Sequence, residues 1–207
     1  ALNTPGFILG EGSSSGVPMG ALFEVLTGLG GVLSAVALYT VAKRYSHRAA
    51  LGFVTTRVLE CAVIFMGVLS IMSMYSLRQD LAGSGDSRSL LTTGHALVAM
   101  HDWTFLIGPG LMPALNALCI GSVMYRSRLL PRWIPTLGLV GAPLLLASFT
   151  ATLFGLWDQI STPAALLTLP IAVWELSFGI FMTVKGFKAT SVSDASFTPV
   201  NSAIAEA

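Results

Sequence analysis

The chain has 207 residues, of which 54% are hydrophobic and only 10% are charged, and its formal net charge is +1. Its mean hydropathy of +0.76 excludes an ordinary soluble domain, in which roughly 25% of residues are charged. The near-neutral balance gives no sign of a nucleic-acid partner or of an acidic partner. The composition instead predicts an integral membrane protein whose main partner is the lipid bilayer.

Several segments are long and apolar enough to cross the hydrocarbon core as helices, for which about 20 apolar residues suffice. Four of them have clear bounds, namely residues 19–42, 49–77, 133–156 and 162–184. A fifth lies between the second and third of these. We therefore predict an all-α, polytopic bundle with five spans in this chain, in which small residues such as Gly28 permit close helix contact.

The segment 90–125 is too long for one straight span, and a Gly-Pro-Gly run at 108–110 interrupts it. Proline removes a backbone donor and clashes with the preceding turn, so we expect a break or kink at this run. We predict a short interfacial or re-entrant helix over about 90–99, followed by a kinked span over about 101–125.

Basic residues outside the spans are distributed unequally between the two sides of the predicted bundle. Eight lie on one side: Lys43, Arg44, Arg48, Arg126, Arg128, Arg132, Lys185 and Lys188. Only Arg78 and Arg88 lie on the other side. The positive-inside rule makes the eight-residue side cytoplasmic, which puts the N-terminus of this chain outside a plasma membrane. Residues 1–188 then form one transmembrane domain, and 189–207, which lack periodicity, are predicted to be a disordered cytoplasmic tail.

A few ionisable residues lie inside the predicted spans, where a charge costs about 2.5–3.5 kcal/mol on insertion scales. Arg57 and Glu60 have the spacing i, i+3, which places them on one helix face and close enough to pair. In one interpretation they are a structural pair whose arginine reaches toward the cytoplasm. Glu60 lies too deep for its side chain to reach the cytoplasm, so this carboxyl group needs a partner or a proton. Glu175 lies near mid-bilayer and is expected to share a polar pocket with Arg57 or Asn116.

His101 and Asp102 open the predicted third span and allow two interpretations. In the first, Asp102 caps the helix and Trp103 belongs to the interfacial aromatic belt. In the second, the helix begins near Leu91, which places the pair at mid-membrane. A continuous helix would then present Asp102 and Asn116 on the same face.

The count of buried charges predicts a shared site. Arg57 is the one lysine or arginine inside the spans, against Glu60, Glu175 and, in the second interpretation, Asp102. Either His101 is protonated, one or two carboxyls are neutral, or a bound cation completes the balance. We predict that Arg57 lies within salt-bridge or one-water distance of at least one of these acids. The candidate ligand-binding residues are Arg57, Glu60, His101, Asp102, Trp103, Asn116, Trp174 and Glu175.

Other signals identify neither a cofactor nor a reaction. Glu24 lies about one turn inside the outer surface and is interpreted as interfacial. Cys61 and Cys119 lie in apolar runs and are interpreted as small buried hydrophobic residues. No metal site is predicted, because the sequence has no CxxC or His/Cys cluster. It also has no motif for hydrolysis, nucleotide binding or haem attachment, so the cofactor stays unknown.

Four sequence runs resemble a known family: RVLE (57–60), HDWTFLIGPG (101–110), MYRSRLLPRWIPTLGL (124–139) and WELSFG (174–179). In this order they resemble the bacterial integral-membrane family catalogued as domain of unknown function 4386, over about residues 5–188. The resemblance implies a fold and no activity. Its motif residues coincide with Arg57, Glu60, His101, Asp102, Trp103, Trp174 and Glu175. Family members carry one more hydrophobic helix before the start of this chain, so six spans are expected in a full-length member. A preceding segment would also explain the start at Ala1 and an outside N-terminus.

Three functions follow as hypotheses. The first is a membrane protein that binds or transports a small ligand, ion or proton at the buried polar residues. The second is an accessory or assembly subunit of a membrane complex, or a homo-oligomer, in which the buried charges set the helix register. The third is a membrane-embedded enzyme using His101 and Asp102. Adjacent helix residues point about 100° apart, which counts against the third.

Overall fold

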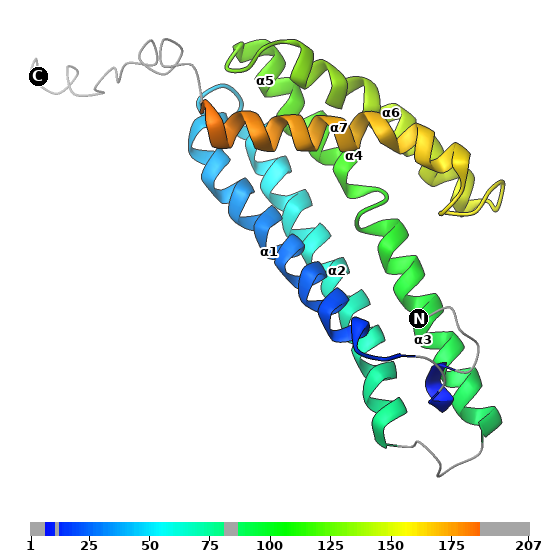
Figure 1. Cartoon of the computed structure of the whole chain (residues 1–207). Helices are drawn as coiled ribbons and strands as arrows, with labels where there is room; N and C mark the ends of the chain where they lie inside the picture. The colour runs from blue at the N-terminus through cyan, green and yellow to red at the C-terminus, as the bar shows by residue number, and fades with distance from the viewer. Residues whose placement is uncertain (1–6, 11–12, 81–86, 187–207) are drawn as a thin grey trace, which may run out of the picture.

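All regular secondary structure in residues 7–10, 13–80 and 87–186, the part of the chain that the computed structural model describes, is helical (Figure 1). The elements are η1 (Phe7–Leu9), α1 (Gly16–Ala42), α2 (His47–Asp80), α3 (Ser87–Ile107), α4 (Met112–Asn116), the π-helical η2 (Ala117–Gly121), α5 (Ser122–Ser127), α6 (Trp133–Leu153) and α7 (Thr162–Val184). Five helical stretches are long and apolar enough to span a membrane: α1, α2, residues Arg88–Ser127, α6 and α7. The predicted all-α fold with five candidate spans is therefore confirmed. The predicted tail, 189–207, lies outside the described residues.

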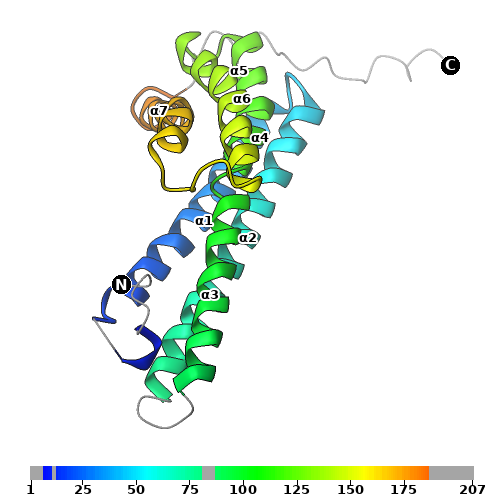
Figure 2. The ribbon, with the colours of Figure 1, turned by 90° about the vertical axis from the view of Figure 1, so that its right-hand side faces the viewer.

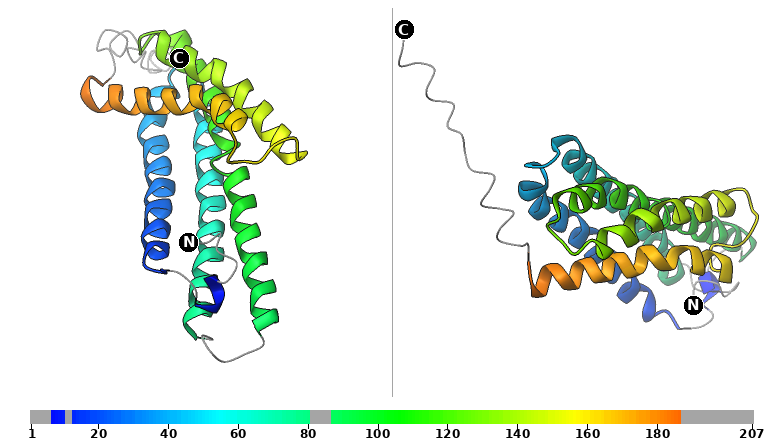
Figure 3. Two further views of the ribbon diagram at one scale, coloured as in Figure 1. Left: turned by 45° about the vertical axis from the view of Figure 1, so that its right-hand side comes forward. Right: turned by 90° about the horizontal axis from the view of Figure 1, so that it is seen from above.

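The helices are arranged as a long layer with a second layer across one end of it. α1 and α2 form an antiparallel hairpin, and α3 runs beside α2 (Figures 1 and 2). α6 and α7 form a second hairpin, and α7 runs across α1 and α2 instead of alongside them (Figure 3, left). This crossing brings the middle of α7 over the α1–α2 pair, although the two are far apart in the sequence.

The third span differs from the prediction in its first half. α3 is continuous over Ser87–Ile107, so the separate short helix predicted over 90–99 is wrong. Residues 99–101 include no proline and no residue that favours a turn, so the helix continues through them. The chain does leave the helix at the Gly-Pro-Gly run, where Gly110 donates to the Phe105 carbonyl at 3.0 Å before α4 begins. The predicted break is thus confirmed.

Glycines bring α6 and α7 into close contact, as expected for helices that pack inside a membrane. A Cβ atom on Gly138 would lie 2.7 Å from the ring of Trp174, and one on Gly141 would lie 2.9 Å from the backbone nitrogen of Ile171. Trp174 is only 2% exposed. Its ring fills the space that the missing side chain of Gly138 leaves. Gly28 of α1 packs in the same way against Cys61 of α2, since its Cβ would lie 3.1 Å from that sulfur.

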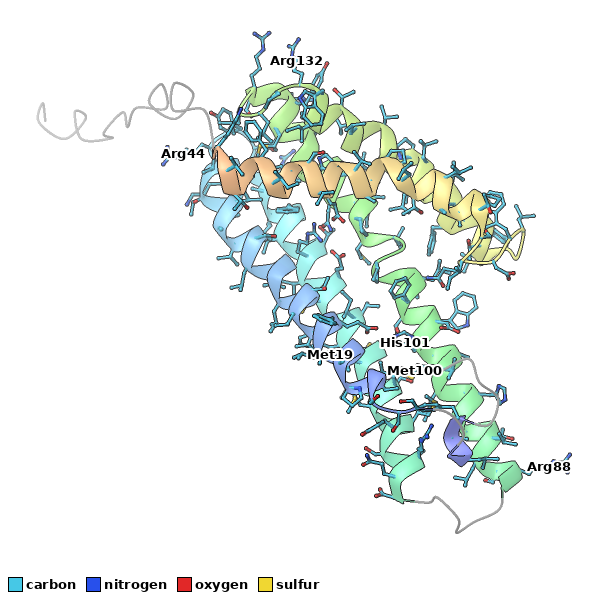
Figure 4. The ribbon with its side chains drawn as sticks, in the orientation of Figure 1. Met19, Arg44, Arg88, Met100, His101 and Arg132 are labelled. Atoms are coloured by element: carbon cyan, nitrogen blue, oxygen red, sulfur yellow. The ribbon has the colours of Figure 1, made fainter. Side chains whose placement is uncertain are left out.

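Basic residues gather at one end of the molecule. Arg44, which follows α1, and Arg132, which precedes α6, lie at the same end, whereas Arg88 lies at the opposite end (Figure 4). The fold therefore keeps the loop after α1 and the loop before α6 at the same end.

The Gly138–Trp174 contact leads to a stability prediction. Gly138→Ala forces a methyl group against the indole ring and should destabilise the protein by about 1–3 kcal/mol, the usual cost of overpacking a filled core. Gly30→Ala is the matched control, because a Cβ at Gly30 meets nothing within 4 Å. The control should be neutral or slightly stabilising. Thermal unfolding in detergent measures both, and equal melting temperatures for the two variants would contradict the packing described.

Candidate functional site

Arg57 of α2 joins two carboxylates from different helices. Its Nη1 donates to Glu60 Oε2 at 2.9 Å, and its Nη2 donates to Glu175 Oε1 of α7, also at 2.9 Å. The first contact is the i, i+3 pair that the spacing predicted. The second exists because α7 crosses α2 at this level. The prediction that Arg57 lies within salt-bridge distance of at least one of these acids is therefore confirmed, and two acids pair with it.

Asn116 extends this cluster toward the broken third span. It is the last residue of α4 and is completely buried. Its Nδ2 donates to Glu60 Oε2 at 2.8 Å, and its Oδ1 accepts from the Thr56 hydroxyl at 2.6 Å. Asn116 directly precedes the π-helical η2, and single π turns inside helices often occur at functional sites. Thr56, Arg57, Glu60, Asn116 and Glu175 thus form one continuous polar network, called the Arg57 cluster below.

The two carboxylates of the Arg57 cluster have different surroundings. The Glu60 side chain is 10% exposed and accepts from both Arg57 and Asn116. The Glu175 side chain is 37% exposed and, within the described part of the chain, accepts one hydrogen bond, from Arg57. Glu60 is therefore enclosed in the network, whereas Glu175 has capacity for a further partner.

A cavity of about 350 Å³ adjoins the Arg57 cluster between α1, α2 and α7. Arg57 and Glu175 are its charged lining residues, and Ser34 of α1 contributes a hydroxyl. Aromatic rings form much of the rest: Phe178 stacks on Trp174 with centroids 5.9 Å apart, and Phe53 lies 5.7 Å from the guanidinium carbon of Arg57. Small-molecule sites combine apolar walls with a few convergent polar groups in this way.

Arg57 and Glu175 both lie well inside their helices. Arg57 lies ten residues after the start of α2 and Glu175 nine residues before the end of α7. At 1.5 Å per residue, each is roughly 14–15 Å along its own helix from the nearer helix end. In the described residues, Arg57 is the cation of this cluster and faces both glutamates. One guanidinium therefore faces two carboxyl groups.

Asp102 and Trp103 do not belong to this cluster. α3 begins at Ser87, so the interpretation of Asp102 as a helix cap is wrong. The expectation that Asp102 shares a face with Asn116 is also wrong: the Asp102 side chain is 65% exposed, whereas Asn116 is buried. The break at 108–111 changes the helix direction between them. Trp103 is 51% exposed and points away from the core as well.

His101 belongs to a different pair. Its Nε2 lies 3.1 Å from Glu24 Oε1 of α1, and its Nδ1 lies 3.8 Å from Asp102 Oδ1. The interpretation of Glu24 as merely interfacial missed this contact. The only signal for it in the sequence was an acid inside an apolar segment. Trp174 lines the cavity beside the Arg57 cluster, but its indole mainly fills the α6–α7 contact.

The fold and the buried polar network together define a multi-pass membrane protein with an internal charged site. The family model described as "Domain of unknown function (DUF4386)" matches residues 8–186, and the chain belongs to this family. No curated protein and no solved structure matches the chain.

The ion pairs of Arg57 predict a non-additive effect on stability. Arg57→Ala leaves Glu60 and Glu175 without their counter-charge and should destabilise the protein by about 3–5 kcal/mol, the cost of breaking a buried pair from one side. Adding Glu60→Gln and Glu175→Gln to that variant should restore part of the loss. Unfolding free energies in mixed micelles measure the cycle. Arg44→Ala, at an exposed position, is the control and should change little. A triple variant less stable than Arg57→Ala alone would contradict the shared ion pairs.

Proposed function

We propose that the protein binds a small cation or a proton at the Arg57 cluster and exchanges it within the membrane. The observation that carries this proposal is the charge balance: one guanidinium pairs with two carboxylates. An uncompensated carboxylate is costly in a low-dielectric interior. A proton or a bound cation supplies the missing positive charge.

Glu175 is the proposed exchange group and Glu60 the fixed one. Glu175 lines the cavity and has one hydrogen bond, so a proton or cation can reach it without breaking the network. Glu60 is held by Arg57 and Asn116. Arg57 keeps both acids in place, and the aromatic walls of the cavity suit a small organic cation as well as an inorganic one.

The orientation of the protein in the plasma membrane is part of the proposal. The end that carries Arg44 and Arg132 (Figure 4) is the cytoplasmic end under the positive-inside rule. The Arg57 cluster is then nearer to the cytoplasm. In this orientation the loop that contains Asp158 faces outward.

A second candidate is an accessory subunit of a membrane complex, and one observation favours it. In the most apolar window of α7 only 11% of the residues are buried, compared with 44% in α2. A partner helix on α7 would cover this surface. The buried charges would then have a structural role only. The enzyme hypothesis gains no such support, because Asp102 is turned away from the interior.

Chemical modification of Glu175 tests the proposed exchange. Dicyclohexylcarbodiimide reacts with protonated carboxyl groups in apolar surroundings. In buffer free of alkali cations, Glu175 should be modified, and modification should fall when Na⁺, K⁺ or tetramethylammonium is added or when the pH is raised. Peptide mass spectrometry measures the extent at each carboxyl group.

Asp102 is the internal control, since it lies in a span but outside the Arg57 cluster, and its modification should not respond to added cations. Glu175→Gln should abolish the cation-sensitive signal. If Glu175 stays unmodified at every pH and ionic condition while Asp102 reacts, both glutamates are permanently ion-paired. That result would favour the accessory-subunit function.

Thiol labelling tests the orientation. Ser46→Cys lies between α1 and α2, and Asp158→Cys lies between α6 and α7. In intact cells, a membrane-impermeant maleimide should label Asp158→Cys and should label Ser46→Cys only after permeabilisation. Variants that also carry Cys61→Ala and Cys119→Ala remove the background. Labelling of Ser46→Cys in intact cells would show that the orientation is the opposite of the proposed one.

A further inference from the structure

Glu24 and His101 form a second, half-buried polar pair that the proposed function does not use. They join α1 to α3, with Glu24 Oε1 3.1 Å from His101 Nε2. Gly67 of α2 packs beneath them, and a Cβ there would lie 3.3 Å from His101 Cδ2. Gly67 is seven residues after Glu60, or about 10 Å along α2. The pair is therefore separate from the Arg57 cluster.

A cavity of about 290 Å³ lies against this pair. Its walls include the aromatic rings of Phe23 and Phe105, the side chain of Ile64, and Pro109 in the break of the third span. The Phe105 ring lies 6.3 Å from the His101 ring, tilted by 34°. Flat apolar walls converge on one polar corner formed by Glu24 and His101, an arrangement that suits a planar ring with a polar substituent.

The cavity opens on the exposed side of α1, which faces away from the other helices. Phe23 is 61% exposed and Thr27 is exposed too, and both lie in the apolar segment of a candidate span. An occupant that enters past these residues comes from the bilayer and not from water. The cavity therefore selects for molecules that dissolve in lipid.

The polar corner favours a neutral ligand that donates a hydrogen bond. His101 already faces Glu24, so their charges can balance each other without a charged ligand. Nε2 of His101 is directed at Oε1 of Glu24, which leaves the second carboxylate oxygen as an acceptor. A hydroxyl on an aromatic ring can donate to that oxygen while the ring lies between the aromatic walls.

We propose that the Glu24–His101 cavity binds small, lipid-soluble aromatic alcohols, the class of phenols and hydroquinones. Glu24 accepts the hydrogen bond from the ligand hydroxyl, and His101 orients Glu24. Phe23, Ile64 and Phe105 hold the ring. The inference does not rest on the proposed function of the Arg57 cluster.

Equilibrium binding to the full chain in lipid nanodiscs tests the inference, with naphthol as the probe and partition into empty nanodiscs subtracted. Two matched probes are methylnaphthalene, which lacks the hydroxyl, and naphthylmethylamine, which carries a cation instead. Naphthol should bind saturably and at least about tenfold more tightly than methylnaphthalene, since the hydrocarbon leaves the acceptor unused. Equal affinity for the two would overturn the inference. Preferential binding of the amine would overturn it as well, in favour of a cation site.

Variants locate the binding. Glu24→Gln should weaken naphthol binding about tenfold, and Ile64→Trp should abolish it by filling the cavity. Asp158→Asn is the control, because Asp158 lies between α6 and α7 and does not line the cavity. Size-exclusion profiles and melting temperatures establish that each variant is folded. A further variant, Thr27→Phe, narrows the opening from the lipid side and keeps the test valid if Glu24→Gln does not fold. Naphthol binding that Ile64→Trp and Thr27→Phe leave unchanged would overturn the inference.

Discussion

The guanidinium of Arg57 determines how the two layers of this protein fit together. A charge of this kind inside an apolar bundle is tolerated only when it is paired and hydrogen-bonded. Its two nearest carboxylates come from its own helix and from α7. The ion pair to Glu175 is therefore also a tertiary contact, which joins the α6–α7 hairpin to the α1–α2 pair (Figure 1). Removing the guanidinium would leave two acids facing each other where α7 crosses α2, beside the apolar contacts of Trp174 and Phe53.

The break in the third span serves the same site. A continuous helix through residues 108–111 would carry Asn116 along the direction of α3, away from Glu60. The Gly-Pro-Gly run interrupts the hydrogen-bond ladder, and α4 restarts with a different direction. Asn116 then meets Glu60 at 2.8 Å. The same break provides Pro109 to the cavity beside Glu24 and His101. One local irregularity thus shapes both polar sites, and irregular backbone at this depth is usual where it lines a cavity.

Much of the fold could be predicted from sequence, because the length and apolarity of a span are local properties. The Arg57–Glu60 pair could also be predicted, since i, i+3 spacing on a helix fixes proximity. The participation of Glu175 followed from its depth in the span and from the count of buried charges. These predictions needed no knowledge of how the helices are arranged.

The relative register of different helices could not be predicted in this way. The contact of His101 with Glu24 depends on the register of α3 relative to α1, which the sequence of neither helix determines by itself. Asn116 was expected in the polar pocket of Glu175, but the second argument for it, that it shares a helix face with Asp102, fails at the helix break. The helix over 90–99 was predicted, but its continuity with the residues after 101 was missed, because the effect of the nearby Gly-Pro-Gly run was taken to extend too far. Its influence extends only over the turn that loses its donor.

The central claim is that the Arg57 cluster holds one exchangeable positive charge besides the guanidinium. Infrared difference spectroscopy of the purified protein tests it most directly, because a protonated carboxyl group has a C=O stretch that a carboxylate lacks. In buffer without alkali cations, a step in pH should produce such a band, and Glu175→Gln should remove it. Added cations that bind at the cluster should reduce it in the unsubstituted protein. A spectrum that shows Glu60 and Glu175 as carboxylates throughout, with no response to cations, would contradict the claim and leave a purely structural ion-pair network.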